Sequence, residues 1–235
     1  MFLYRFSYYK IFNFGFTSLL CKKKPGMPTK LLLVLDLNGT LLNRINKSEL
    51  KLIDPSVVLP TNTFSSGINK VFLRPHLETF LNYIFNAEHI TVCVWTSAEL
   101  TAATDLCHKV FGIYSPKLAF VLNRSMCVGA PMGIKAGKTV RKPLDRIWSS
   151  NQYNPKNIWN RINTILIDDS AYKGVDHPRN MYLLQPFDVT DLKVVPTADE
   201  DLLTITNWLK DQGTSSVDDI RESLDIRRNL NVHSK

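Results

Sequence analysis

The stretch LLLVLDLNGTLL, residues 31–42, decides the fold. Its first five residues form a continuous apolar run, which ends at Asp36. Short apolar runs without alternation are typical of strands that are buried on both faces, as in parallel sheets covered by helices. We therefore expect residues 31–35 to form a strand inside an α/β domain.

Two later segments repeat this pattern. The apolar run at residues 90–95 stops at Thr96, and the run at residues 165–167 stops at Asp168. The carboxyl ends of parallel strands meet at one edge of the sheet, where ligands bind in open α/β folds. The sequence therefore predicts that these two side chains and Asp36 converge on one site.

Amphipathic segments lie between and after the expected strands. One helix is predicted to start with Pro75 in its first turn, and its apolar stripe is Leu77, Phe80, Leu81, Ile84 and Phe85. A second is predicted from a Ser97 cap to Gly112, with an inward face of Leu100, Ala103, Leu106, Cys107 and Val110. Closing helices are expected over residues 198–210 and 217–229. Strands alternating with helices predict an open, mostly parallel sheet with helices on both faces.

Two turn-rich segments lack a helical period. Residues 43–71 are expected to form a small β-hairpin flap beside the first strand, with no large cap domain. Residues 118–128 suggest a second hairpin.

Composition limits the classes of function. The 235 residues are 44% hydrophobic and 21% charged, which suits one large domain or one domain with appendages. Of the 29 basic side chains, six lie in residues 1–35, where no acid occurs, so 23 basic side chains face 21 acidic ones in the remainder. The net charge of +8 thus falls to +2 for residues 36–235, and we expect no direct nucleic-acid binding. The four cysteines show no paired motif, so free thiols are predicted.

The residue types at the strand ends fit phosphoryl transfer. A carboxylate at Asp36 can attack phosphorus and form an aspartyl phosphate. Gly39 would let the backbone approach the phosphoryl group. Asp168 and Asp169 offer oxygen ligands for Mg²⁺, which would neutralise its charge.

Each of these assignments has a simpler alternative. Asp36 could cap a helix or a turn, and Asp168-Asp169 could cap the turn that follows them. Thr96-Ser97 could be only a capping pair. A phosphate-binding lysine is expected at Lys142, but Lys135, Lys138 and Arg141 are close to it, and a solvated basic face explains that cluster equally well.

The ordered set of motifs resembles the haloacid-dehalogenase-type phosphatases, specifically the branch of small carboxyl-terminal-domain phosphatases. The resemblance covers residues 29–212 and rests on five segments: DLNGTLL at 36–42, FLRPHL at 72–77, VWTSA at 94–98, the lysine at 142 and IDDS at 167–170. It implies that Asp36 is the nucleophile and a Mg²⁺ ligand. The other implied metal ligands are the backbone carbonyl of Asn38 and the carboxylates of Asp168 and Asp169. The implied phosphate-binding residues are Gly39, Thr40, Thr96, Ser97 and Lys142.

One position departs from the family pattern. The family usually has an aspartate two residues after the nucleophile, as general acid and then base, and this chain has Asn38. An amide cannot protonate a leaving alkoxide, and such help is typically worth about 10²–10⁴-fold. Asp169 is the candidate replacement.

Three functions follow from the resemblance. The first is a Mg²⁺-dependent phosphatase acting on phosphoserine or phosphothreonine in a phosphoprotein or polypeptide, in the nucleus or cytoplasm. The second is a non-catalytic binding protein, because the family also includes the presequence-binding receptor subunit of the mitochondrial inner-membrane import translocase. The third is a small-molecule phosphatase.

The domain organisation is predicted in three parts. Residues 1–27 form a basic, aromatic-rich leader or extension, residues 28–212 the phosphatase-like domain, and residues 213–235 a C-terminal helix and tail. The leader is compatible with mitochondrial targeting, and Met27 as the true start is the alternative. No apolar run reaches the about 20 residues of a conventional transmembrane helix.

Overall fold

The computed structural model describes residues 30–129, 140–191, 196–214 and 218–233. The predicted leader at 1–27 lies outside these ranges. The centre of the fold is a five-stranded sheet in which every strand pair is parallel. Its order is β10-β9-β1-β5-β6. The bounds are β1 Leu31–Leu35, β5 Ile90–Trp95, β6 Val121–Leu122, β9 Thr164–Asp168 and β10 Met181–Leu183.

Strand β1 lies at the centre because all its side chains can be buried. Its five residues are apolar and none exceeds 5% exposure. It pairs with β5 on one side and with β9 on the other, so the chain order reverses at β1. In an open α/β sheet the crevice at such a reversal is the usual ligand site. The register places Leu35 beside Val94 and Ile167, so the residues that follow the three strands lie at one edge.

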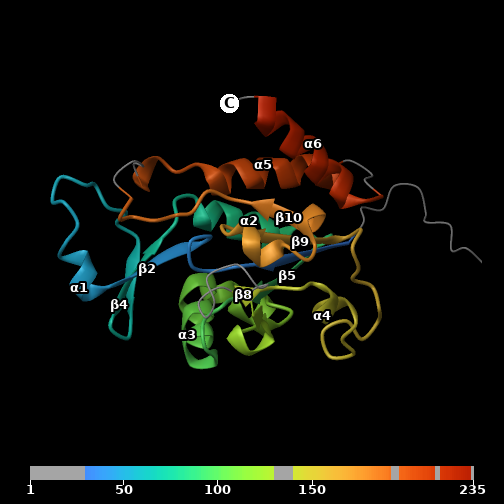
Figure 1. Ribbon diagram of the computed structural model, residues 1–235, viewed down its shortest axis with the longest axis horizontal. Coiled ribbons are helices and arrows are strands. Elements are labelled where there is room, and N and C mark those ends of the chain that lie inside the picture. Colours follow the sequence, from blue (N-terminus) through green and yellow to red (C-terminus); the bar gives the residue numbers. More distant parts are fainter. Residues whose placement is uncertain (1–29, 130–139, 192–195, 215–217, 234–235) are drawn as a thin grey trace, which may run out of the picture.

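Helices cover both faces of the sheet, which confirms the predicted fold class. The buried residues of α2, α3, α5 and α6 belong to the core cluster on one face, and α4 packs in the cluster on the other; Figure 1 labels these helices around the sheet. Alternate residues of β1 divide between two core clusters: Leu33 and Leu35 pack in the cluster with α2 and α5, and Leu32 and Val34 pack in the cluster with α4.

The helix bounds are α1 Lys47–Leu50, α2 Leu77–Asn86, α3 Leu100–Phe111, α4 Asp145–Trp148, α5 Asp201–Thr214 and α6 Ile220–His233. Short 3₁₀ helices are η1 Gly112–Lys117, η2 Arg124–Met126, η3 Ala171–Gly174, η4 Pro178–Asn180 and η5 Pro196–Ala198. The two predicted closing helices are confirmed as α5 and α6, each starting three residues later than expected. Within the ranges described above, no helix is long and apolar enough to cross a membrane.

The starts of α2 and α3 differ from the prediction. Pro75 precedes α2 instead of entering its first turn, because His76 takes a left-handed conformation with φ of 61° and ends the preceding turn. Ser97 does not cap α3, whose N-cap is Glu99. Leu100 was expected to point inward and is 63% exposed, because the later start places it in the open first turn. The end of α3 at Gly112 is as predicted.

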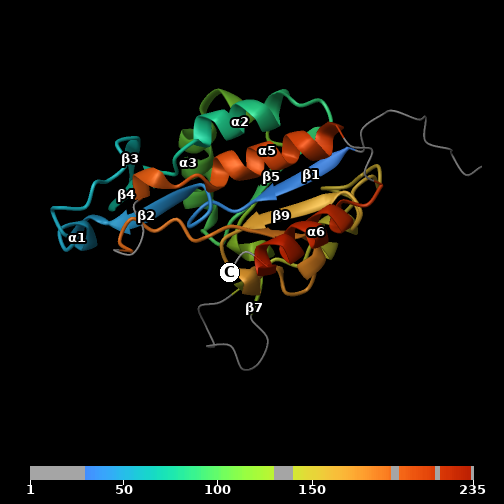
Figure 2. The ribbon, with the colours of Figure 1, turned by 90° about the horizontal axis from the view of Figure 1, so that it is seen from above.

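The flap after β1 is larger than a hairpin. It is a three-stranded antiparallel sheet of order β2-β4-β3, with bounds β2 Leu42–Asn46, β3 Thr63–Ser66 and β4 Asn69–Leu73. The predicted hairpin is the β3–β4 pair, to which β2 adds an edge strand, and α1 follows β2. Figure 2 shows this flap beyond the carboxyl end of β1. No larger domain is inserted at this position among the described residues.

The second predicted hairpin, at residues 118–128, is wrong. Its first half forms β6, which adds a parallel edge strand to the main sheet beside β5. Its end forms β7 (Val128–Gly129), which pairs antiparallel with β8 (Val140–Arg141). The apolar residues of this segment alternate weakly, so the pattern did not distinguish strands that pair with each other from strands that pair elsewhere.

Candidate active site

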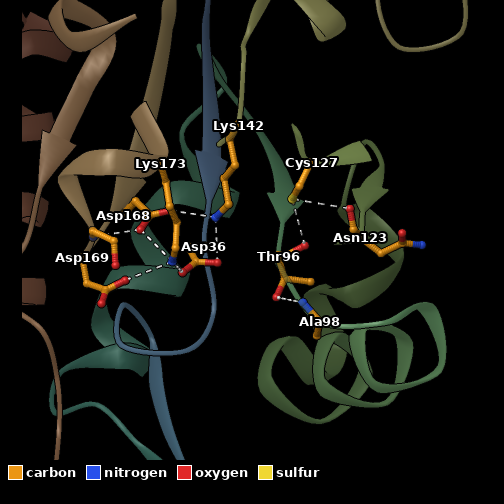
Figure 3. A network of polar contacts seen from close by, with 10 residues as sticks. Asp36, Thr96, Ala98, Asn123, Cys127, Lys142, Asp168, Asp169 and Lys173 are labelled. Carbon is orange, nitrogen blue, oxygen red and sulfur yellow. Dashed lines mark hydrogen bonds and ion pairs between the residues drawn. The ribbon is translucent and has the colours of Figure 1, made fainter. Parts of the chain in front are cut away.

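Asp36 lies directly after β1, between two lysine side chains. Its backbone N–H donates to the carbonyl of Ile167 at 3.0 Å, which fixes it against β9. Its carboxylate is only 2% exposed. Oδ1 lies 2.8 Å from Nζ of Lys142, and Oδ2 lies 2.7 Å from Nζ of Lys173 (Figure 3). The central carboxylate of the fold therefore has an ammonium group on each oxygen.

Two more carboxylates join this cluster from the end of β9. Asp168 is fully buried, with Oδ2 at 2.6 Å from Nζ of Lys142 and Oδ1 at 3.0 Å from Nζ of Lys173. Asp169 is 14% exposed, and its Oδ1 lies 3.3 Å from the same atom of Lys173. The convergence of Asp36, Asp168 and Asp169 is the arrangement expected from the strand order.

Burial and the neighbouring charges shift the pKa values of three side chains in the cluster. Burial disfavours the ionised form of Asp36, but Lys142 and Lys173 outweigh it, so its pKa lies below the ordinary value. Burial, followed by the negative charge of Asp36, raises the pKa of Asp168 to about 6. Burial also opposes the charge of Lys173, but the three carboxylates outweigh it and raise its pKa. Asp36 is thus the carboxylate that the site keeps ionised.

Lys142 lies in the short connection between β8 and α4, and its side chain is fully buried. Its backbone N–H donates to the carbonyl of Lys173 at 2.8 Å, so the backbones of the two lysines are joined. Among the neighbouring basic residues, Arg141 pairs instead with Asp176. Lys135 and Lys138 lie outside the described residues.

Lys173 is the site residue that the sequence reasoning missed. It lies in η3, four residues after Asp169, and reaches Asp36, Asp168 and Asp169. The available signal was the lysine in DDSAYK, residues 168–173, because a turn of helix after the acidic pair brings that side chain back to it.

The loop after Asp36 packs closely against Asp169. Gly39 has φ of 83°, and a Cβ there would lie 2.5 Å from Oδ2 of Asp169. Only glycine fits both the conformation and the space. The predicted phosphate ligand Thr40 is buried, and its hydroxyl has no hydrogen-bond partner among the described residues.

Asn38 projects from the same loop and is exposed. Its Oδ1 accepts a hydrogen bond from the backbone N–H of Arg44 in β2 at 2.9 Å. The amide thus joins the loop after the nucleophile to the first strand of the flap.

Thr96 follows β5, on the side of Asp36 opposite to Asp168 (Figure 3). It is buried, and its Oγ1 accepts a hydrogen bond from the N–H of Ala98 at 3.2 Å. Asp168 likewise accepts from the N–H of Ser170 at 3.0 Å. Thr96 and Asp168 therefore both cap the turns that follow them, and both also lie at the carboxyl edge of the sheet beside Asp36. Ser97 is half-buried next to Thr96.

The donor set of the site fits Mg²⁺. Carboxylate oxygens of Asp36, Asp168 and Asp169 all lie within 4.8 Å of one another. Hard divalent cations prefer such oxygen ligands. Nζ of Lys173 already contacts all three carboxylates, so a cation there has to share or replace that contact.

An open parallel sheet, a small flap and a lysine-flanked aspartate after the central strand are the arrangement expected of the haloacid-dehalogenase class. The model of the NLI interacting factor-like phosphatase family matches residues 31–221, and the chain belongs to this family. The predicted family is thereby confirmed.

The chain is also similar to individual proteins. An uncharacterized FCP1 homology domain-containing protein of Schizosaccharomyces pombe is 26% identical over 184 residues, which are 76% of this chain and 70% of that protein. The structure of Fcp1, an essential RNA polymerase II CTD phosphatase, matches 86% of this chain at 17% identity with a TM-score of 0.47. The fission yeast Fcp1 bound to beryllium fluoride matches 87% at 14% identity with a TM-score of 0.46. The chain spans 53% and 56% of those two structures.

Proposed function

We propose that this chain is a Mg²⁺-dependent phosphatase that removes phosphate from phosphoserine or phosphothreonine in a polypeptide, through an aspartyl phosphate on Asp36. The observation that carries the proposal is the placement of Asp36 after the central strand, ionised, with an ammonium group on each carboxylate oxygen. A small flap in place of a large cap domain favours a polypeptide substrate over a small enclosed one.

The first half-reaction forms a bond between Asp36 and phosphorus and breaks the bond from phosphorus to the serine or threonine oxygen. The leaving oxygen takes a proton, and a water molecule then attacks the phosphoenzyme and releases inorganic phosphate. Lys142 holds Asp36 in place against Asp168. We assign the binding of phosphoryl oxygens to Thr96 and Ser97 after β5 and to Gly39 and Thr40 in the loop after Asp36.

Asp36, Asp168, Asp169 and the backbone carbonyl of Asn38 would hold the divalent cation, which would supply positive charge to stabilise the transferred group. The proton for the leaving oxygen cannot come from the amide of Asn38. Asp169, the candidate replacement, pairs with Lys173 and is itself a proposed metal ligand, so we assign it no acid role and expect the leaving oxygen to take its proton from water.

The test is hydrolysis by the full-length chain with and without Mg²⁺. The substrates are p-nitrophenyl phosphate, a phosphoserine peptide and a sugar phosphate. We expect activity that needs Mg²⁺, disappears in Asp36→Asn and is higher on the peptide than on the sugar. Unchanged activity in Asp36→Asn contradicts the mechanism. A preference for the sugar phosphate favours a small-molecule phosphatase.

A second candidate is a non-catalytic binding protein, as in the presequence-binding subunit of the mitochondrial import translocase. The observation that favours it is Asn38, whose amide holds the flap and cannot act as an acid. A native chain that is silent on p-nitrophenyl phosphate, which has a good leaving group, would support it. Import of a tagged full-length chain into mitochondria with cleavage near residue 27 would favour a presequence-binding protein over other binding proteins.

A further inference from the structure

Lys173 takes the position in which a metal ion would make its contacts. Its Nζ lies 2.7 Å from Asp36, 3.0 Å from Asp168 and 3.3 Å from Asp169. These three residues form a group of carboxylates that could hold a metal ion. One ammonium group therefore satisfies the three carboxylates that a divalent cation would need.

The two cations cannot hold these contacts together. The candidate ligand atoms span no more than 4.8 Å, and Mg²⁺ requires oxygen ligands at about 2.1 Å. An ammonium nitrogen inside the same group of oxygens would lie within a few ångströms of the ion, where like charges repel strongly in a buried site. Binding of the metal and the present position of Nζ are therefore mutually exclusive.

The backbone around Lys173 is fixed, so the side chain is the part that can move. The N–H of Lys173 donates to the carbonyl of Ser170 at 2.9 Å, and its own carbonyl accepts from Lys142 at 2.8 Å. A Cβ on Gly174 would lie 2.6 Å from Sδ of Met181, so the next residue is packed tightly against β10. The long lysine side chain, with four rotatable bonds, can withdraw Nζ without any shift of η3.

We propose that Lys173 is a resident counter-ion of the metal position: it holds the three carboxylates together before the metal arrives, and Mg²⁺ binds by displacing its ammonium group. Lys173 is thus a positioning residue that sets the affinity of the site for divalent cations. This inference rests on the proposed function, because it requires that the site takes Mg²⁺.

The first experiment is Mg²⁺ titration of the full-length chain by isothermal calorimetry. Lys173→Met removes the competing charge and keeps the aliphatic length, so we expect Mg²⁺ to bind at least tenfold more tightly than to the native chain. Lys156→Met is the matched control, because Lys156 is exposed and the change in net charge is the same. Its Mg²⁺ affinity is expected to equal that of the native chain.

The second experiment needs no variant, so it tests the proposal even if Lys173→Met does not fold. Reductive methylation of lysines is followed by peptide mass spectrometry without and with saturating Mg²⁺. The side chain of Lys173 is only 8% exposed, and its labelling is expected to rise several-fold when Mg²⁺ binds. Labelling of Lys156 is expected to stay constant.

Equal Mg²⁺ affinity of the native chain and Lys173→Met, or unchanged labelling of Lys173 while Mg²⁺ is bound, overturns the displacement. In those cases Mg²⁺-dependent hydrolysis that persists leaves the proposed function standing. Failure of both the native chain and Lys173→Met to bind Mg²⁺ overturns this inference, and it overturns the metal dependence of the proposed function as well.

Discussion

Oδ1 of Asn38 accepts a hydrogen bond from the backbone N–H of Arg44 at 2.9 Å. This contact joins the loop that follows the nucleophile to strand β2 of the flap. The side chain at position 38 is therefore a structural link, at the position where the family usually has an acid. An aspartate could accept the same hydrogen bond, because its carboxylate oxygens are acceptors as well.

The first prediction is that Asn38→Asp raises the rate of hydrolysis. A carboxyl group can protonate the leaving oxygen, so we expect a gain of about 10²–10⁴-fold on a phosphoserine peptide. The gain on p-nitrophenyl phosphate is expected to be smaller, since that leaving group needs little protonation. Steady-state kinetics with Mg²⁺ on both substrates measure the difference.

Asn38→Ala is the control for the structural part of this effect. It removes the hydrogen bond to Arg44 and introduces no acid. The activity of Asn38→Ala should therefore be equal to that of the native chain or lower. A comparable gain in Asn38→Ala and Asn38→Asp would show that release of the flap, and not proton transfer, limits the native chain.

Much of this site could be predicted from sequence because it depends on strand ends. The apolar runs before Asp36 and Asp168 fix their directions, and parallel register then brings them together without knowledge of any loop. Lys173 could not be placed in this way. Its i, i+4 spacing from Asp169 predicts a contact only if a helical turn forms there, and the four residues of η3 show no helical period of their own.

The parts of the fold that were predicted wrongly also depend on tertiary contacts and not on the local sequence pattern. The β6 and β7 segments are two residues each, so their partners are set by tertiary packing and not by local pattern. The start of α3 also depends on context. Ser97 has a good capping side chain, yet the turn at Thr96 and Ala98 delays the helix to Leu100.

The second prediction concerns Gly39. Gly39→Ala places a methyl group 2.5 Å from the carboxylate of Asp169 and forces a side chain into a positive-φ conformation, which alone costs roughly 1–2 kcal/mol. We expect a larger loss of unfolding free energy than that, together with weaker Mg²⁺ binding because Asp169 is displaced. Urea denaturation and calorimetry measure the two effects.

Gly67→Ala separates the clash from the conformational strain. Gly67 also has a positive φ, of 56°, but a Cβ there would meet nothing within 4 Å. Gly67→Ala should lose only the unfolding free energy that the conformational strain costs, and it should bind Mg²⁺ as the native chain does. Equal effects of the two substitutions would contradict a steric role for Asp169.

The third prediction concerns two buried thiols. Burial raises the pKa of Cys107 to about 12 and raises that of Cys93 well above its ordinary value. At pH 8 both are protonated, and the thiolate is the form that reacts. Iodoacetamide followed by peptide mass spectrometry should leave both unmodified in the native chain and modify both in urea. Rapid native labelling of either one would contradict its burial.

The last prediction concerns Arg74, which ties the nucleophile loop to the C-terminal part of the chain. Its guanidinium group is fully buried and binds both carboxylate oxygens of Asp199, at 2.8 and 2.7 Å, and donates to the carbonyl of Thr40 at 3.1 Å. Arg74→Met leaves the 9% exposed carboxylate of Asp199 without its partner. We expect a loss of about 3–5 kcal/mol in unfolding free energy, measured by urea denaturation.

Two variants test the cause of this loss. Asp199→Asn added to Arg74→Met should restore part of the stability, because it removes one of the two charges, of Asp199 and Asp201, that lose Arg74 as a partner. Arg179→Met breaks the exposed pair with Asp225, whose side chains are 52% and 36% exposed, and should cost no more than about 1 kcal/mol. If Arg74→Met costs as little as Arg179→Met, then the buried pair does not hold the nucleophile loop to the start of α5.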